Sequence, residues 1–180
     1  GRTAEYVLGG LLDLEIRTIT PEDAEAIASL RREDGVRDKV LAISSDREDV
    51  TLKFIKSLGP RDRGFIAEED GLIVGMGCIV SAKAPNRRHC ARIAVMVRTS
   101  AQGRGVGRKL MKHIIECADN ELCLHRLELL VLTDNDRAVS LYKDFGFMIE
   151  ATKRNAAVVR GRFTDEYLMG RLRGEGREKR

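Results

Sequence analysis

Residues 91–118 read ARIAVMVRTSAQGRGVGRKLMKHIIECA, and this stretch says more about the fold than any other. The apolar run at 91–97 predicts a buried strand, and the amphipathic repeat that ends the stretch predicts a helix. Between them lie Gly103, Gly105 and Gly107, which let another molecule approach the backbone closely. The first turn of a helix offers unpaired N–H groups and the positive end of its dipole. The stretch therefore predicts an anion site, suited to phosphate, at the start of the helix.

Two common phosphate-binding loops do not account for these glycines. The P-loop pattern G-x-x-x-x-G-K-[ST] is absent, and the glycine spacing is one residue too short for the dinucleotide pattern G-x-G-x-x-G. The N-terminal strand–helix–strand unit that surrounds the dinucleotide pattern is missing as well. From the glycines alone, a tight turn between a strand and a helix is an equal alternative to phosphate binding.

Outward from this stretch, the chain alternates between patterns typical of short strands and helices. Strands are predicted at 14–19, 64–68, 72–80, 91–97, 126–132, 146–151 and 158–169. Helices are predicted from Thr20-Pro21, from Ser45 with Glu48 completing a capping box, after the glycine loop, and at 135–145. Asp70-Gly71 predicts a hairpin between two of the strands. The order indicates one α/β (α+β) domain, with a mixed sheet and helices on both faces.

The composition fits a compact domain rather than a membrane or secreted protein. The chain has 180 residues, of which 43% are hydrophobic, and no run of 18 apolar residues. Its N-terminus lacks the pattern of a secretory signal. Cysteines at 78, 90, 117 and 123 match no zinc or redox spacing. We therefore expect reduced thiols, no metal site, no membrane contact and a cytoplasmic protein.

Positive charge is concentrated at the C-terminus. The formal net charge is +4, and residues 171–180 hold five basic and two acidic residues. This segment is expected to be a flexible basic tail, with binding to nucleic acid or an acidic surface as the alternative. The lack of Trp and the few Phe and Tyr disfavour nucleic acid, whose bases stack on aromatic side chains. The predicted organisation is an extension at 1–13, a domain at 14–170 and this tail.

Two motifs resemble those of the GNAT family of N-acetyltransferases. Val95-Met96-Val97 followed by Gln102-x-x-Gly105-x-Gly107 is similar to the family's [Q/R]-x-x-G-x-[G/A] signature. The segment NDRAVSLYKDFGF at 135–147 is similar to the family's N-x-x-A-x-x-L-Y-x-x-x-G-F segment. The two motifs stand at the family's usual separation, and the resemblance extends over 14–170. It implies a mixed, mostly antiparallel central sheet flanked by helices, and an N-acetyltransferase that uses acetyl-CoA.

The resemblance also implies the residues that bind acetyl-CoA. The backbone of Val95, Met96 and Val97 would pair with the pantetheine arm, in the gap where this strand parts from the strand at 126–132. Backbone amides of the loop would hold the pyrophosphate, from Gln102, Gly103, Arg104, Gly105, Val106 and Gly107. Asn135 would contact the cofactor, cap its helix, or do both.

Tyr142 is the candidate catalytic residue by the same resemblance. Its hydroxyl would act as the general acid that protonates the departing CoA thiolate. The alternative is a core aromatic, because Tyr142 shares an apolar helix face with Ala138 and Leu141. The reaction would be direct attack of a neutral amine on the thioester, with the oxyanion stabilised by a backbone N–H near Val97.

The sequence leaves open which group accepts the proton of the amine. Many family members carry a Glu on the strand before the glycine loop, whereas residues 92–97 include no carboxylate. His89, just before this strand, and Glu128, on the neighbouring strand, are the candidates, and His113 is expected to be structural or solvated.

The acceptor is implied by the C-terminal segment, 151–169, which resembles a bacterial branch of the family. That branch includes enzymes that acetylate free L-amino acids, so a small primary amine of this kind is the first expectation, with its pocket around 37–45. N-terminal acetylation of a protein, such as a ribosomal protein, and a non-catalytic acyl-CoA-binding regulatory module are the alternatives. The family also makes a homodimer an expectation.

Two further features are open to more than one interpretation. Arg87-Arg88 could steer an acidic acceptor or lie in a solvated loop. Gly75 and Gly77, within a strand, indicate a bulge or close backbone approach near the acceptor, or simple packing.

Overall fold

A single mixed sheet organises the protein. The computed structural model describes residues 13–39 and 47–175, and in this part seven strands follow the order β1-β2-β3-β4-β5-β7-β6. The strands are β1 (Leu14–Thr18), β2 (Arg63–Glu69), β3 (Leu72–Ser81), β4 (Cys90–Val97), β5 (Arg126–Leu132), β6 (Met148–Val159) and β7 (Arg162–Leu172). Neighbouring strands are antiparallel except for β4 and β5, which run parallel. The predicted mixed, mostly antiparallel sheet is therefore confirmed.

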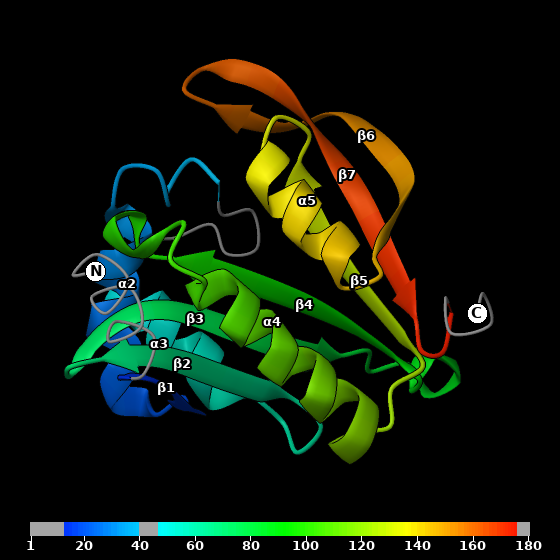
Figure 1. Cartoon of the computed structure of the whole chain (residues 1–180), viewed down its shortest axis with the longest axis horizontal. Helices are drawn as coiled ribbons and strands as arrows, with labels where there is room; N and C mark the ends of the chain where they lie inside the picture. The colour runs from blue at the N-terminus through cyan, green and yellow to red at the C-terminus, as the bar shows by residue number, and fades with distance from the viewer. Residues whose placement is uncertain (1–12, 40–46, 176–180) are drawn as a thin grey trace, which may run out of the picture.

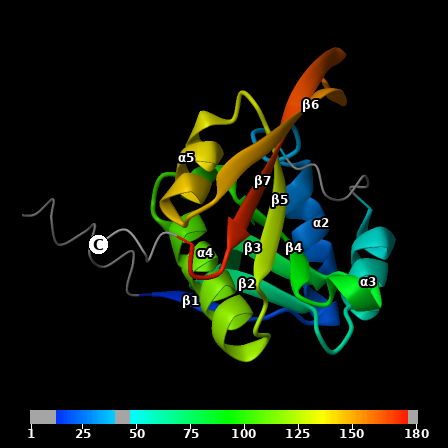
Figure 2. The same ribbon diagram turned by 90° about the vertical axis from the view of Figure 1, so that its right-hand side faces the viewer.

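Helices cover both faces of the sheet, as Figures 1 and 2 show. One face carries α4 (Val106–Glu116) and α5 (Asp136–Asp144), and the other carries α2 (Ala24–Arg32) and α3 (Glu48–Ser57). The larger core lies under α4, whose Leu110 and Ile114 are fully buried. A second core lies under α2, around Ile27 and Leu30. The apolar stripes in the sequence thus mark the faces that meet the sheet.

Glycines in β3 let α4 pack close to the sheet. A Cβ on Gly77 would lie 2.7 Å from Ile114 Cδ1, and one on Gly75 would lie 3.0 Å from Leu110 Cδ1. The β2–β3 register also shifts beside Gly75. Of the interpretations that the sequence left open, packing under α4 accounts for both glycines.

The hairpin between β2 and β3 forms as predicted. Asp70 has φ of 50° and Gly71 has φ of 77°, so both central residues adopt the left-handed conformation. Two such residues form the turn whose twist matches that of paired strands.

The feature that shapes the site is the separation of β4 from β5. Their parallel ladder holds three pairs, Cys90 with Arg126, Ala91 with Leu127, and Arg92 with Glu128. Beyond Arg92 the ladder ends, while β5 stays paired with β7 along its whole length. Figure 1 shows the two strands diverging into a wedge. The expected parting of these strands is therefore present in the fold.

Two predicted element boundaries are wrong. α3 begins at Glu48, with Arg47 in extended backbone before it, so no helix runs on from Ser45, which lies outside the described residues. β6 is one strand from Met148 to Val159, and the chain turns at Arg160-Gly161, where the sequence predicted a break at 152–157. Most β6 side chains are exposed, so the strand has no buried face to produce an alternating pattern.

The boundary of the expected tail also needs correction. β7 continues to Leu172, and Arg171 forms an ion pair with Asp119 at 2.8 Å, with both side chains largely buried. Arg173 donates to the Asp119 carbonyl oxygen at 3.1 Å. The basic segment thus begins as part of the sheet, and residues 176–180 lie outside the described residues, as do residues 1–12 of the expected N-terminal extension.

Candidate active site

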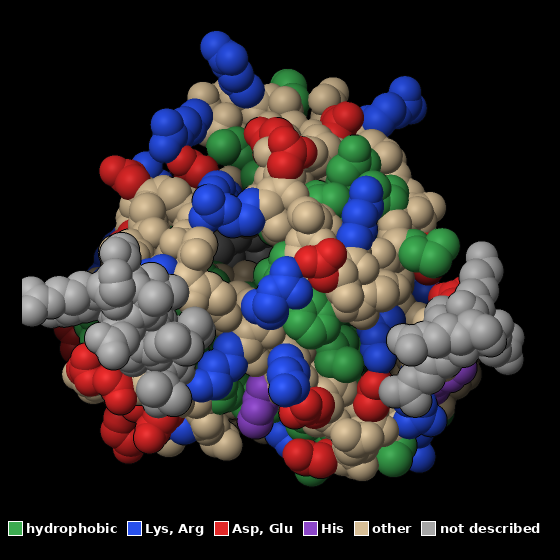
Figure 3. Space-filling model, viewed as in Figure 1, with side chains coloured by type: hydrophobic (Ala, Val, Ile, Leu, Met, Phe, Trp, Pro, Cys, Tyr) green, Lys and Arg blue, Asp and Glu red, His purple; other side chains and the backbone are tan. Residues whose placement is uncertain are grey.

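A cavity of about 570 Å³ extends from the wedge between β4 and β5 to the start of α4. Its wall brings together nine of the residues predicted to bind the cofactor or to catalyse: Val95, Met96, Val97, Gln102, Gly103, Gly105, Gly107, Asn135 and Tyr142. Figure 3 shows this face of the molecule, hollowed near its centre and rimmed by Lys and Arg side chains. The two motifs, far apart in sequence, therefore meet around one space.

Two predicted cofactor residues do not line this cavity. The Arg104 side chain turns away to Glu69 at the end of β2, with Nη2 2.5 Å from the carboxylate. Val106 is buried in the core beneath α4. Only the backbone of these two residues can contribute to a site in the loop.

The loop before α4 has the geometry of an anion site. Gly103 has φ of 76° and Gly105, the residue preceding the helix, has φ of 86°, conformations that strongly favour glycine. The Gln102 side-chain amide donates to the Val97 carbonyl oxygen at 3.1 Å, which ties the loop to the end of β4. A Cβ on Gly107 would lie 3.3 Å from Leu141 Cδ2, so this glycine lets α5 approach α4. Backbone N–H groups at the start of α4 are therefore presented to the cavity.

Two arginines add positive charge beside this loop. Arg137 lines the cavity, with Nη1 3.7 Å from where a Cβ on Gly103 would lie. Arg108 also lines it, but it donates to Asp144 at 2.7 Å and lies 5.8 Å above the Phe145 ring. No described residue forms an ion pair with Arg137, so its charge is available to a bound anion. Arg137 is not among the predicted cofactor residues, because one exposed arginine in a helix carries no pattern.

The position of Tyr142 fits both roles that the sequence left open. Its ring is 8% exposed and meets Phe147 edge to face at 6.1 Å between centroids. The same residue lines the cavity, and no described residue hydrogen-bonds to its hydroxyl. Burial raises the pKa of Tyr142 to about 12. The hydroxyl therefore stays protonated near neutral pH and can donate a proton or a hydrogen bond.

Asn135 caps α5. Its Oδ1 accepts a hydrogen bond from the Ala138 backbone N–H at 3.4 Å. The residue also lines the cavity. The capping role is confirmed, and the cofactor contact stays a prediction.

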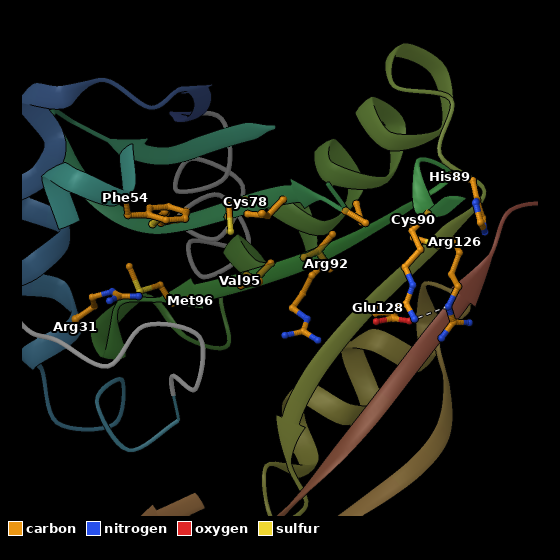
Figure 4. Close-up of a pocket in the computed structure, with 18 of the residues that line it drawn as sticks. Arg31, Phe54, Cys78, His89, Cys90, Arg92, Val95, Met96, Arg126 and Glu128 are labelled. Carbon is orange, nitrogen blue, oxygen red and sulfur yellow. Dashed lines mark hydrogen bonds and ion pairs between the residues drawn. The ribbon is translucent and has the colours of Figure 1, made fainter. Parts of the chain in front are cut away.

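A second cavity, of about 830 Å³, lies on the opposite face of β4. Its floor is apolar, with Met76 and Cys78 from β3 and Ala94 and Met96 from β4. Figure 4 shows Arg31 of α2 and Phe54 of α3 at one end, and Arg126, Glu128 and His89 at the other. Both cavities are lined by residues 92–96, so β4 is the wall between them. A molecule in one cavity can thus reach a molecule in the other past the edge of β4.

The two candidate bases both line this second cavity, at different distances from the end of β4. His89 precedes Val95 by six residues, about 20 Å at the usual rise of a strand. Glu128 pairs with Arg92, three residues from Val95, or about 10 Å along the strand. Glu128 accepts a hydrogen bond from Arg126 Nε at 2.9 Å. Glu128 is therefore the nearer of the two candidate bases to a reaction at residues 95–97.

His113 lies apart from both cavities. Its ring packs edge to face on Phe65 in the core, with 4.6 Å between centroids and an interplanar angle of 81°. This contact gives it a structural role.

Other expectations concern membranes, metals and disulfides. Within 13–39 and 47–175, no helix is long and apolar enough to cross a membrane. In the same ranges, no three His, Cys, Asp or Glu side chains gather to hold a metal ion. All four cysteines are free thiols, with Cys78 and Cys117 buried and Cys123 exposed.

A parted parallel strand pair with a glycine loop at the next helix is the arrangement that the resemblance to CoA-dependent acetyltransferases implied. The chain belongs to the acetyltransferase (GNAT) family, whose sequence profile matches residues 25–147, and it is an acetyl-CoA-dependent N-acetyltransferase. It is similar to the L-amino acid N-acetyltransferase AaaT of Escherichia coli (strain K12). The two are 31% identical over 161 residues, which are 89% of this chain and 99% of that protein.

Solved structures share the fold. An acetyltransferase of the GNAT family from Streptococcus pneumoniae superposes with a TM-score of 0.78 at 27% identity, covering 88% of this chain and 99% of that one. YncA of Salmonella typhimurium, solved with its cofactor acetyl-CoA, has a TM-score of 0.78 at 23% identity, covering 91% and 95%. These similarities agree with the order of strands and helices described above.

Proposed function

We propose that this N-acetyltransferase acetylates the α-amino group of free L-amino acids. The observation that carries the proposal is the second cavity, which shares residues 92–96 with the cofactor cavity. Its apolar floor and its arginines suit a small molecule that bears a carboxylate. The similarity to an L-amino acid N-acetyltransferase over most of both chains supports the same acceptor class.

Acetyl-CoA would be held by the residues around the first cavity. The backbone of residues 95–97 offers N–H and C=O groups to the amides of pantetheine on the side away from β3, because the pairing with β5 ends at Arg92. The amides of residues 102–107 and the Arg137 guanidinium would hold the pyrophosphate. Asn135, at the start of α5, would contact the arm between them.

The reaction follows from this placement. The amine attacks the thioester carbonyl carbon, a C–N bond forms, and the carbonyl oxygen becomes an oxyanion that accepts from a backbone N–H near Val97. As the C–S bond breaks, the sulfur takes the proton of the Tyr142 hydroxyl. The attacking nitrogen loses its own proton through water to Glu128, the nearer of the two candidate bases.

The assay is release of CoA thiol from acetyl-CoA in the presence of single L-amino acids, and of peptides with the same N-terminal residues. We expect turnover with free amino acids and none with the peptides. Turnover with peptides alone would indicate N-terminal acetylation of proteins. Binding of acetyl-CoA without turnover of any amine would indicate a non-catalytic module.

The homodimer stays a prediction. β6 is an edge strand, and Val158 and its register partner Phe163 at the end of the β6–β7 hairpin are 65% and 72% exposed. A long exposed edge with apolar side chains favours pairing with a second chain. Sedimentation of the wild type and of Phe163→Glu tests this: a dimer that the substitution dissociates supports it, and a wild-type monomer contradicts it.

Cytoplasmic location is likewise proposed, on the supply of acetyl-CoA there and on the four free thiols. Cell fractionation tests it, and recovery of the protein with the secreted fraction would contradict it.

A further inference from the structure

The second cavity is apolar in its floor and strongly basic around it. Among the residues that the structure describes, four arginines line it, Arg31, Arg87, Arg92 and Arg126, against one carboxylate, Glu128. A cavity with this excess of positive charge attracts anions and repels cations.

Not all of these charges are equally available to a ligand. Arg126 donates to Glu128 and to Glu150, both at 2.9 Å, so its charge is already neutralised. No described residue forms an ion pair or side-chain hydrogen bond with Arg87 or Arg92. Both are exposed at the opening, where a ligand can replace their water.

Arg31 is a further positive charge at the inner end, and it already has an interaction partner. It is 4% exposed and lines the cavity from α2. Burial raises the pKa of the Cys78 thiol, on the floor of the cavity, to about 11. The positive charge of Arg31 has the opposite, smaller effect on this pKa, so the charge acts on the floor. Figure 4 shows Arg31 at one end of the cavity and Arg92 pointing into the opening beside β5, with the apolar floor between.

We propose that the acceptor is an L-amino acid with an acidic side chain, of the L-glutamate or L-aspartate type. Its side-chain carboxylate would meet Arg92 at the opening, with the methylene groups over Met96 and Ala94. This inference rests on the proposed function and narrows its substrate class. It also predicts that a polyamine is a poor acceptor, because its charges would face the arginines.

The test compares L-glutamate with L-glutamine, which has nearly the same shape and a neutral side chain, and with spermidine. We expect kcat/KM for L-glutamate to exceed that for L-glutamine by at least about tenfold, and spermidine to be the poorest acceptor. The preference for L-glutamate should shrink as NaCl is raised, because the arginines at the opening are exposed to solvent.

Two variants locate the effect. Arg92→Gln should lower kcat/KM for L-glutamate by about tenfold or more while changing the value for L-glutamine by less than about threefold. Arg88→Gln is the matched control, because the Arg88 side chain does not line the cavity. Arg61 donates a hydrogen bond to the Arg88 carbonyl oxygen at 3.1 Å, and the substitution keeps that backbone atom. Both variants should keep the stabilisation by acetyl-CoA, which shows that the fold is intact.

Calorimetric titration of the CoA-bound enzyme separates this inference from the proposed function. If L-glutamate binds more tightly than L-glutamine and Arg92→Gln removes the difference, the charge assignment stands even where no acetyl group is transferred. Equal use of L-glutamate and L-glutamine, or a preference for spermidine, overturns the inference and leaves the acetyltransferase activity in place.

Discussion

Arg92 and Glu128 form the last pair in the parallel ladder between β4 and β5, and beyond them the strands part. Both side chains line the second cavity, and Arg92 also lines the first, between β4 and β5. This pair therefore stands at the junction of the two spaces. The sheet therefore opens about 10 Å along β4 from residues 95–97, where the acceptor and the thioester are proposed to meet.

Substitution of a loop glycine tests the cofactor site. Gly105→Glu places a negative charge and a side chain at the start of α4, where the pyrophosphate is proposed to bind, on a backbone with φ of 86°. Acetyl-CoA at about 100 times its Kd should raise the stability of the wild type by about 2.7 kcal/mol. In this 180-residue chain, that corresponds to a Tm shift of roughly 5–10 °C. The variant should show no shift.

The matched control for this experiment is Gly71→Glu. Gly71 also has positive φ, lies in the β2–β3 turn and has no atom within 4 Å of a built Cβ. It should lose some stability to backbone strain and keep the full shift with acetyl-CoA. A shift retained by Gly105→Glu would remove the assignment of the loop.

Removal of the Tyr142 hydroxyl tests the general acid. Tyr142→Phe should lower kcat by about 10²-fold, because the CoA thiolate then leaves without a positioned proton. Affinity for acetyl-CoA should stay within about twofold, since the ring and its contact with Phe147 are kept. With the pKa of Tyr142 near 12, the wild-type rate should not decline through its ionisation below about pH 11. Single-turnover kinetics measure the step, and an unchanged rate would return Tyr142 to a packing role.

The close approach of α4 to β3 predicts a paired substitution. Gly77→Ala should destabilise the fold by about 1–3 kcal/mol, because its Cβ would lie 2.7 Å from Ile114 Cδ1. Ile114→Val removes that methyl group, so the double variant should regain part of the loss. Urea unfolding measures all three proteins. If the double variant is less stable than the two separate losses predict, the contact is not the cause.

Burial of Cys78 predicts a loss of stability at alkaline pH. Burial raises the pKa of its thiol to about 11, above the usual value near 9. The unfolded chain therefore releases this proton first, and stability falls as pH rises from about 9 to 11. A single group of this kind contributes a slope of up to about 1.4 kcal/mol per pH unit. Cys78→Ala should flatten the slope, whereas Cys123→Ala, at an exposed position, should leave it unchanged.

Local backbone chemistry explains what the sequence predicted well. Asp70-Gly71 and Gly105 adopt the left-handed conformation, which favours particular residue types. A motif built on such residues can therefore be recognised in the sequence. β6 is different, because its exposed side chains follow no alternation and its end is set by the turn at Arg160-Gly161. The strand was therefore predicted in two pieces with a gap.

Side-chain direction limits what two loop residues can contribute to a cofactor site. The side chains of Arg104 and Val106 turn to Glu69 and to the core, which leaves only the predicted backbone amides. The second cavity could not be predicted from the sequence, for another reason. Arg31 and Glu128 come from elements nearly a hundred residues apart, and neither belongs to a motif.

The proton acceptor can be tested with two carboxylates that share one arginine. Arg126 donates to Glu128 and to Glu150, each at 2.9 Å, but only Glu128 lines the acceptor cavity. Glu128→Gln should lower kcat by about 10²-fold at pH 7, where the amine must lose a proton to a base. The deficit should shrink as pH rises toward the pKa of the free amino acid's α-amine, which lies above the roughly 7.7–8.0 of a chain terminus, because solvent then supplies the neutral amine. Glu150→Gln should stay within about threefold of the wild type, and so should His89→Asn. Equal losses in Glu128→Gln and Glu150→Gln would assign the effect to the position of Arg126, and the proton would then need another path.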